Sequence, residues 1–330
     1  MLWILSVFLA GTVFAQPERP IRRPADNKLA LETIEAPVRL ETPEAVQGMT
    51  ARLVFHVSPL SGNGLLSQQV RDALKALDKA NGDAVFLKLR AFVAGTGDVR
   101  RIQSIVTEEF SSKKWPLPAI TTVLVGALPG DNTQVVIEGI SEEKRNNVNP
   151  AGLVFVPAQP SVAGLGKAME AAGAVALRVS CFADSLAGAE SARAEAVKVF
   201  PGAAGTFFQS TRSGIGNGVS CEGVGRLPGR SAAARAPLVE RMGSAVLVRS
   251  PKLVFTAAQM TFVEQDSGIQ QAYERLRRAI LALGGGAGET ILANHYSVAG
   301  LGESPGSAGL VIEGLTLDAN VAVEIVAAIE

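Results

Sequence analysis

The sequence has few of the residues that build metal centres, and no excess of charge of either sign. It contains only two cysteines and two histidines in 330 residues, and these do not stand at the short spacings that a zinc site requires. The 31 basic and 31 acidic residues cancel, so electrostatics favours neither nucleic acid nor an anionic membrane as a partner. We therefore expect no metal and no nucleic-acid partner.

Long apolar runs and phosphate-binding loops are also missing. The apolar run from Leu2 to Phe14 falls short of the ~20 residues that span a bilayer as a helix. Residues 214–218 read Gly-Ile-Gly-Asn-Gly without a helical pattern after them, and the glycines of 284–288 follow a helix instead of preceding one. Neither stretch cradles a phosphate, and we expect no cofactor. With 47% hydrophobic residues, the chain is typical of two or three folded domains.

Residues 1–15 are predicted to be an export signal. The apolar run ends in Val13-Phe14-Ala15, which places small residues at both positions that a signal peptidase recognises, although no Lys or Arg precedes it. An uncleaved anchor and a buried N-terminal strand are the alternatives. Residues 16–35 then predict an extended linker, because repeated proline removes backbone donors and disfavours helix. The protein is thus expected to be exported, with no stable membrane span once the signal is removed.

An internal repeat organises the remainder of the chain. The triplet Leu-Val-Phe recurs at 100-residue intervals, at 53–55, 153–155 and 253–255. Each copy is followed by an amphipathic helical pattern closed by glycine and then by a second strand. We place the three repeats at residues 36–148, 149–230 and 231–330.

Each repeat predicts the element order β-α-β-α-β-β, and hence an α+β protein. The second strands are predicted at residues 85–93, 175–182 and 290–298. Repeats 1 and 2 add a second helix, whereas repeat 3 runs from Ala299 to Gly309 through mainly Gly, Ser and Pro, so its second helix is expected to be missing. All three are predicted to end in a hairpin whose last strand carries a glutamate, at residues 135–140, 219–224 and 321–328.

The end of repeat 1 resembles a motif of the Rid (YjgF-like, reactive-intermediate deaminase) family. Two β-branched runs, 118–129 and 134–140, flank the turn-forming residues Pro129-Gly130-Asp131-Asn132. The family's segment reads Pro-Ala-Arg-Thr/Ser, an alternating strand, Leu-Pro, a turn and a closing strand in which Glu alternates with Ile or Val. Here Ile120 replaces the family arginine.

The resemblance covers roughly residues 36–330 and implies a chorismate-mutase-like fold. Rid proteins are typically homotrimers whose three sheets face inward, with helices outside and ligand clefts between subunits. A chain with three RidA-like copies can satisfy that arrangement alone, so we expect a monomer that acts as a pseudo-trimer. The alternative is three independent domains that trimerise separately.

The resemblance also tells where a deaminase would keep its reactive groups. A Rid deaminase binds the carboxylate of a small imine or enamine acid through an arginine fork and positions water with a glutamate. The arginine position holds Ile120, Ala203 and Ser307 in the three repeats. Glu138 and Glu222 align with the second family glutamate, and Glu324 with the first. Substitute cations on the second strands are Arg90, Arg178 and His295, for which the alternative is exposed strand residues or salt-bridge partners.

Two functions from different classes remain open. The first is an exported, catalytically degenerate Rid-like protein, a pseudoenzyme that binds a small metabolite in a cleft between repeats. The second is a remodelled imine or enamine deaminase, or a related small-molecule hydrolase, that uses Glu138, Glu222 or Glu324 with a cation foreign to the family. Convergence of a cation and a carboxylate across a cleft would distinguish the two.

The resemblance bears on the two cysteines as well. It implies that the second and last strands of a repeat are antiparallel neighbours, which brings Cys181 near Cys221. Export would permit a disulfide between them. The alternative is a pair of small buried hydrophobic residues in a slightly different register.

The export signal predicts the N-terminus of the mature protein. Expression in a secreting host should yield a chain that begins at Gln16, because cleavage follows Ala15. Intact-mass spectrometry of the secreted protein measures this directly. A chain that still carries Met1 would contradict the prediction.

Overall fold

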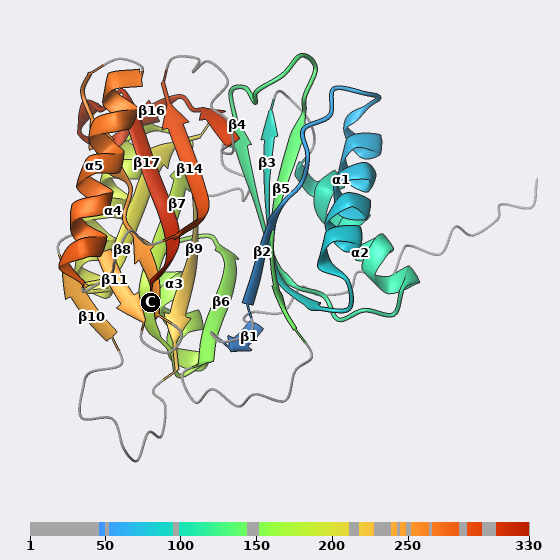
Figure 1. The fold of residues 1–330 in the computed structure, drawn as a ribbon, viewed down its shortest axis with the longest axis horizontal. Helices are drawn as coiled ribbons and strands as arrows, with labels where there is room; N and C mark the ends of the chain where they lie inside the picture. The colour runs from blue at the N-terminus through green and yellow to red at the C-terminus, as the bar shows by residue number, and fades with distance from the viewer. Residues whose placement is uncertain are drawn as a thin grey trace, which may run out of the picture. The chain divides into compact units, whose positions relative to one another are not determined.

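Three successive segments of the chain each build one sheet with helices on one face (Figure 1). The computed structural model describes residues 46–49, 53–94, 99–143, 152–210, 218–227, 239–242, 245–248, 252–263, 266–283, 289–298 and 308–329. The predicted linker and signal of residues 1–35 lie outside these ranges, as does Ser307. The predicted α+β class is confirmed.

The elements of unit 1 are β2 (Leu53–Val57), α1 (Leu66–Asn81), β3 (Val85–Ala94), α2 (Val99–Ser112), β4 (Ala119–Val125) and β5 (Val135–Glu142). The elements of unit 2 are β6 (Gly152–Gln159), α3 (Val162–Ala171), β7 (Val175–Ala183), α4 (Leu186–Val199), β8 (Ala204–Gln209) and β9 (Val219–Arg226). The elements of unit 3 are β12 (Lys252–Thr256), β13 (Gln259–Thr261), α5 (Asp266–Ala282), β14 (Glu289–Ser297), β15 (Ala308–Val311), β16 (Gly314–Leu315), the 3-10 turn η2 (Thr316–Asp318) and β17 (Val321–Ile329).

The three sheets share one strand order. It is β2-β5-β3-β4 in unit 1, β6-β9-β7-β8 in unit 2 and β12-β17-β14-β15 in unit 3. The middle strand β3 pairs in parallel with β4 and antiparallel with β5, and β7 and β14 do the same in their units. The predicted antiparallel pairing of second and last strands is therefore confirmed.

The predicted terminal hairpins are wrong. β4 and β5 are separated by β3, and the same holds for β8 and β9 and for β15 and β17. The turn at Pro129-Gly130-Asp131-Asn132 reverses the chain, with Gly130 at φ 84° and Asn132 at φ 59°, but it carries the chain across an intervening strand. The pattern of β-branched residues identified both strands without indicating their partners.

Short strands from outside each unit extend two of the sheets. β1 (Val46–Met49), which precedes unit 1, pairs antiparallel with β6 of unit 2, and β16 of unit 3 pairs with β8 of unit 2. β10 (Val239–Met242) and β11 (Ala245–Val248) add to β12 of unit 3. Exchanged strands cover edges that would otherwise present unpaired backbone groups, so the sheet of unit 2 is completed by strands from both sides of the sequence.

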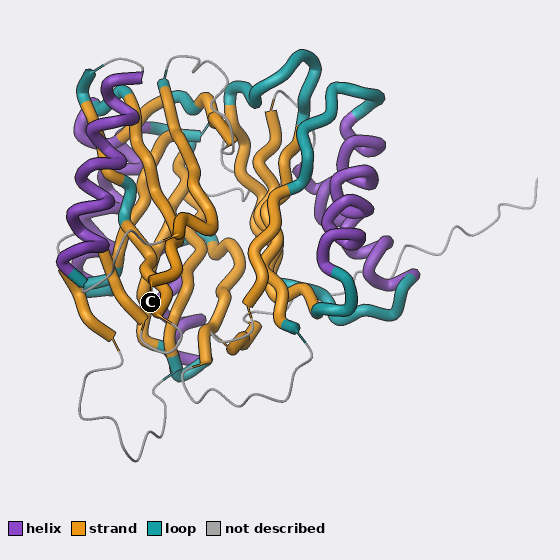
Figure 2. The backbone as a smooth tube through the Cα atoms, viewed as in Figure 1, coloured by secondary structure: helices purple, strands orange, loops and turns teal. Residues whose placement is uncertain are grey.

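The helices cover the outer face of each sheet (Figure 2). In α1 the predicted stripe of Val70, Ala73, Leu74 and Leu77 is buried against unit 1, and Gly82 follows the helix at φ 62°. The helices of unit 2 begin at serine caps: the hydroxyl of Ser161 accepts from the amide N of Gly164 at 2.9 Å, which satisfies one free donor of the first turn.

The three sheets turn their other faces toward one another and share two apolar clusters. One contains Leu87, Leu177 and Leu292 together with the phenylalanines of the Leu-Val-Phe triplets. The other contains Phe92, Phe182 and Tyr296. Each cluster draws residues from all three units, so the core between the sheets requires the whole set.

One expectation falls outside the described residues. In unit 3, β14 ends at Ser297 and β15 begins at Ala308. Residues 299–307, where the second helix was predicted to be absent, lie outside the described residues.

Among the described helices none is long and apolar enough to cross a bilayer.

The shared core predicts a monomer in solution. One chain already supplies three sheets whose inner faces are buried, so the described residues leave no comparable apolar face to drive trimerisation. Light scattering at micromolar concentration should report the mass of a single chain. A mass of three chains would favour the model of three independent domains instead.

Candidate functional site

Register places equivalent residues of the three units on one level. In each middle strand the pairing with the last strand shifts at the same point, between Phe86 and Lys88, between Ala176 and Arg178, and between Thr290 and Leu292. Counting from this bulge, Arg90 corresponds to Ser180 and Asn294. A bulge re-aims the side chains that follow it, and it does so identically in the three units.

All three candidate glutamates occupy the same position. Glu138 lies opposite Arg90, Glu222 opposite Ser180 and Glu324 opposite Asn294. The prediction that Glu324 aligns with a different family glutamate from the other two is therefore wrong by two residues. The two family glutamate positions are two residues apart, so their side chains point to the same face of the strand. Alternation along the strand therefore does not distinguish them.

The arginine position of unit 2 is also corrected by the register. Ile120 lies opposite Leu89 in the parallel pair of β3 and β4, and the residue opposite the equivalent Val179 is Gly205. The register equivalent of Ile120 in unit 2 is thus Gly205 and not the predicted Ala203, which lies two residues earlier. Ile120 is buried under α1 and α2 in the outer core of its unit.

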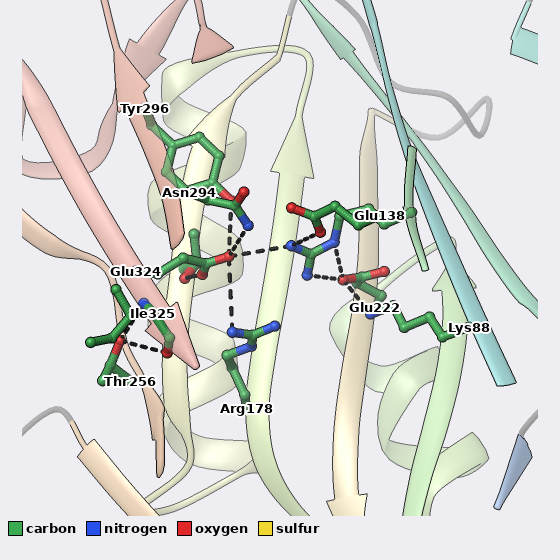
Figure 3. A network of polar contacts seen from close by, with 11 residues as sticks. Lys88, Glu138, Arg178, Glu222, Thr256, Asn294, Tyr296, Glu324 and Ile325 are labelled. Carbon is green, nitrogen blue, oxygen red and sulfur yellow. Dashed lines mark hydrogen bonds and ion pairs between the residues drawn. The ribbon is translucent and has the colours of Figure 1, made fainter. Parts of the chain in front are cut away.

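Arg90 joins the three glutamates in one cluster. Figure 3 shows Glu138, Glu222 and Glu324 converging there from different strands. Nε of Arg90 donates to Oε1 of Glu222 at 2.7 Å, and its Nη2 contacts the same oxygen. Its Nη1 lies 3.2 Å from Oε1 of Glu324 and 3.5 Å from Oε2 of Glu138. A single guanidinium therefore binds carboxylates from all three units.

Two more cations complete the cluster. Nζ of Lys88 lies 2.7 Å from Oε1 of Glu222, and Nη1 of Arg178 lies 4.0 Å from Oε1 of Glu324. Glu324 also accepts from the Tyr296 hydroxyl at 2.9 Å, from the Asn294 amide at 3.2 Å, and from the Thr206 hydroxyl. Three cations thus face three carboxylates, and the cluster lies between the two apolar clusters of the core.

Burial and charge pull the pKa values of these groups in opposite directions. Burial would raise the pKa of Glu222, but the charges of Arg90 and Lys88 outweigh it and hold that pKa well below its usual range. Burial would also raise the pKa of Glu324, but the charges of Arg178 and Arg90 outweigh it and lower that pKa to about 2. Burial raises the pKa of Glu138, which Arg90 offsets only in part. Burial also lowers the pKa of Lys88 to about 8.

The cluster is closed to solvent. Arg90 is 2% exposed, and Glu222 and Glu324 are 1% exposed. Catalysis requires that a substrate reach the reactive groups. The predicted catalytic candidates Arg90, Glu138, Glu222 and Glu324 are therefore brought together, but in a buried core where their charges form ion pairs with one another.

His295 is not part of this cluster. It follows Asn294 on β14, so its side chain points to the opposite face of the sheet, where its Nε2 lies 2.8 Å from the Tyr273 hydroxyl. Burial lowers its pKa. Within the described residues no group of His, Cys, Asp and Glu side chains could hold a metal ion.

The two cysteines meet across the neighbouring strands β7 and β9. Cys181 and Cys221 are directly opposite in the register and are joined as a disulfide in the structure. Both side chains are completely buried against α3 and α4. The bond ties the middle strand of unit 2 to its last strand.

A pocket of about 210 Å³ opens where unit 2 meets unit 3. We call it the junction pocket. Its lining is mostly apolar and consists of Val179, Arg193, Ala196, Val197, Phe200, Gly202, Ala203, Ala204, Gly205, Phe207 and Met260. Met260 belongs to unit 3, and the amide N of Ala258 in that unit donates to the carbonyl of Gly205 at 3.2 Å. The pocket therefore lies beside Gly205, the register equivalent of Ile120, against a neighbouring unit.

Arg193 supplies the positive charge of the junction pocket. Its Nε lies 2.9 Å from Oε2 of Glu190, and Oε1 of Glu190 accepts from the amide N of Leu317 in unit 3 at 2.6 Å. Among the residues that the structure describes, the two terminal nitrogens of Arg193 have no further partner. Half of the guanidinium fork is thus held by Glu190 and half remains available for a ligand.

Several of these residues were not identified from the sequence. Lys88 and Tyr296 belong to the buried cluster, but a single Lys or Tyr on a strand gives no sign of its depth. Arg193 lies on the outer side of an Ala-rich helix, a pattern that predicts solvent exposure. Only the register of the sheets, which the sequence does not display, connects these side chains with the candidate positions.

Comparison with known proteins supports the fold and little beyond it. No protein-family model matches the sequence, and no curated protein matches it either. The crystal structure of a chorismatase is similar over 84% of this chain and 99% of that chain, with 13% identity and a TM-score of 0.51. Two E. coli structures, TdcF with bound serine and the YjgF gene product, are 20% and 21% identical over 32% of this chain and cover 91% and 89% of theirs, each with a TM-score of 0.26. The chorismatase similarity agrees with the predicted Rid-like, chorismate-mutase-like fold.

The buried cluster predicts a large penalty for removing its central cation. Arg90→Met should destabilise the protein by about 3–5 kcal/mol near neutral pH, because it leaves three buried carboxylates with only Lys88 and Arg178 as counter-ions and removes the ion-pair partner of Glu138. Arg277→Met, on the exposed side of α5, is the matched control and should change the stability by less than about 0.5 kcal/mol. Urea unfolding measures both.

The pH dependence distinguishes lost charge from lost volume. The pKa of Glu324 is lowered to about 2 in the folded state, so its contribution is present above the unfolded pKa of roughly 4.3 and is lost as the pH falls toward 2. The difference between Arg90→Met and the wild type should therefore shrink on acidification through this range. A difference that stays constant with pH would indicate a packing defect and contradict the electrostatic account.

Proposed function

We propose that this protein is a non-catalytic, Rid-like binding protein that takes up a small, largely apolar carboxylate in the junction pocket. The observation that carries the proposal is the position of this pocket. It lies beside Gly205, the arginine equivalent of unit 2, and it has its own cation in Arg193. A guanidinium supplied from the adjoining helix can take over the carboxylate-binding task of the missing family arginine.

The size and lining of the junction pocket define the ligand. Its volume of about 210 Å³ exceeds the roughly 150 Å³ in which an apolar protein cavity accommodates benzene. Phe200, Phe207 and Met260 supply apolar surface, whereas Arg193 is the one charged residue of the lining. A ligand with one anionic group and an apolar body of about the size of one ring meets both conditions.

The state of the glutamates supports binding over catalysis. A water-positioning carboxylate must face the bound substrate, yet Glu138, Glu222 and Glu324 are buried among Arg90, Arg178 and Lys88. Arg178 corresponds to Lys88 in the register and Arg90 to Ser180 and Asn294, so the cluster uses different residues in each unit to reach charge balance. The alternative, a remodelled imine or enamine deaminase, would need one of these glutamates to leave the cluster.

Three further parts of the proposal rest on the sequence. We interpret the units as tandem Rid-like repeats whose deaminase motif has degenerated, with Ile120, Gly205 and Ser307 where the family has arginine. The chain acts as a pseudo-trimer. Export through residues 1–15 would place the protein in an oxidising compartment, which is consistent with a bond between Cys181 and Cys221.

Benzoate is a suitable probe of the junction pocket, and uncharged benzamide is its control. Benzoate should raise the unfolding temperature of the full-length protein in a saturable manner, whereas benzamide should have little effect. Arg193→Gln should weaken benzoate binding about tenfold or more, since it removes a charge-assisted contact. Ala203→Leu should abolish binding by filling the pocket. Lys198→Gln, on an exposed face of the same helix, is the matched control and should bind as the wild type does.

Two outcomes would reject the proposal. Equal effects of benzoate on the wild type and on both pocket variants would show that the junction pocket is not the site. Turnover of 2-iminopropanoate that is abolished by Glu324→Gln, in a variant that stays folded by circular dichroism, would favour the remodelled enzyme.

A further inference from the structure

A second and larger pocket lies on the outer face of unit 1, remote in sequence from the junction pocket. It has a volume of about 400 Å³ and is lined by residues of α1 and α2, two helices that lie side by side in Figure 1. We call it the helix groove. Its floor is formed by Leu74, Phe86, Phe110 and Trp115. The volume is within the range of sites that bind small molecules.

The floor of the helix groove is an aromatic cluster. The ring centroids of Phe86 and Phe110 are 5.8 Å apart, and Trp115 lies 5.6 Å from Phe110 in an edge-to-face arrangement. Trp115 remains 36% exposed and also lines an adjoining pocket of about 320 Å³. A large aromatic side chain that keeps this much surface in contact with solvent on a ready-made aromatic floor can receive another ring.

This floor is not a general consequence of the fold. At the position of Phe86 in the register, unit 2 has Ala176 and unit 3 has Thr290. The facing helix of unit 2 buries the small residues Ala189, Ala192 and Ala196. The groove is thus a specific property of unit 1.

Three ion pairs connect α1 with α2 and with Lys113, which follows α2. Nη2 of Arg71 on α1 lies 2.9 Å from Oε2 of Glu108 on α2, and Nη1 contacts Glu109. Nζ of Lys113 lies 2.8 Å from Oδ2 of Asp78 and 4.4 Å from the centre of the Trp115 ring. These charges are compensated within the protein, and the groove is pre-formed.

The two remaining charges of the groove have opposite signs. Asp72 and Lys75 line it from α1, and among the described residues neither has an ion-pair partner. The Oδ1 of Asp72 accepts from the amide of Gln68 at 2.9 Å, which leaves Oδ2 available. Residues at i and i+3 of a helix stand roughly 5–6 Å apart, so a cationic and an anionic site lie side by side above an aromatic floor.

We propose that the helix groove binds an aromatic amino acid as its zwitterion. Its ring would lie against Phe110 and Trp115, its ammonium group would pair with Asp72, and its carboxylate would pair with Lys75. Each part of the ligand meets the group that suits its charge or apolarity. The site shares no residue with the junction pocket, so it stands or fails independently of the function proposed above.

Trp115 itself reports occupancy of the groove. The sequence has two tryptophans, so the full-length Trp3→Phe variant isolates the emission of Trp115. L-Phenylalanine should change this emission saturably. L-Alanine, which has no ring, 3-phenylpropionate, which has no ammonium, and phenethylamine, which has no carboxylate, should each bind at least about fivefold more weakly.

Exposed variants then test the two charges without touching the core. Lys75→Gln and Asp72→Asn, each in the Trp3→Phe background, should raise the dissociation constant of L-phenylalanine about fivefold. Lys79→Gln on the same helix is exposed and does not line the groove, so it should bind L-phenylalanine as the Trp3→Phe protein does.

The proposal is overturned if L-phenylalanine leaves the emission of Trp115 unchanged, or if both charge variants bind it as well as the control does. It is also overturned if 3-phenylpropionate or phenethylamine binds as tightly as L-phenylalanine, because the groove would then recognise an aromatic anion or cation instead of a zwitterion. Calorimetry with L-phenylalanine on the same variants provides a second measurement that does not depend on fluorescence.

Discussion

The contact of Arg90 with glutamates from three units is the interaction on which the core depends. A buried guanidinium is tolerated only when carboxylates surround it, and a buried carboxylate only when cations or hydrogen-bond donors do. Arg90, Glu222 and Glu324 meet this condition together. The sheets must therefore hold one register and one relative placement, whereas the apolar clusters on either side would tolerate small shifts more readily.

The same condition explains why the candidate residues are buried away from solvent. Charged groups in a cleft keep water or substrate as a partner, and their reactivity depends on that access. In this protein the three glutamates are buried in the core and are neutralised there by Lys88, Arg90 and Arg178. Among the described residues, charged groups that can still pair with a ligand line two pockets elsewhere. They are Arg193 beside Gly205, and Asp72 and Lys75 in the groove that contains Trp115.

The sequence predicted local structure well and pairing less well. Apolar periodicity identified α1 and the middle strands, because burial of one face leaves a direct trace in residue spacing. The hairpin from Pro118 to Ile140 was wrong because a turn signal shows where the chain reverses and not which strand lies between its arms. Antiparallel neighbours were correct for the middle and last strands through the family resemblance, which carries topology that periodicity lacks.

Site residues suffered from the same limitation. Ala203 was predicted to be the equivalent of Ile120, but the parallel pairing of β7 and β8 gives that place to Gly205. Alternation along a strand cannot detect a shift of two residues, which is how Glu324 came to be aligned separately from Glu138. Lys88 and Arg90 carry no mark of burial in the sequence, because their depth results from three units that meet in space.

The order of the units along the chain has a consequence for folding during synthesis. When β5 has left the ribosome, the future core holds the cations Lys88 and Arg90 with the single carboxylate of Glu138. Unit 2 adds Arg178 and Glu222, so the nascent core still has one cation in excess. Only Glu324 on β17, which follows the other described strands along the chain, restores electroneutrality. Until that strand is synthesised, the unpaired charge favours hydration of the inner faces of the first two sheets. Pairing of β17 then allows these faces to be buried.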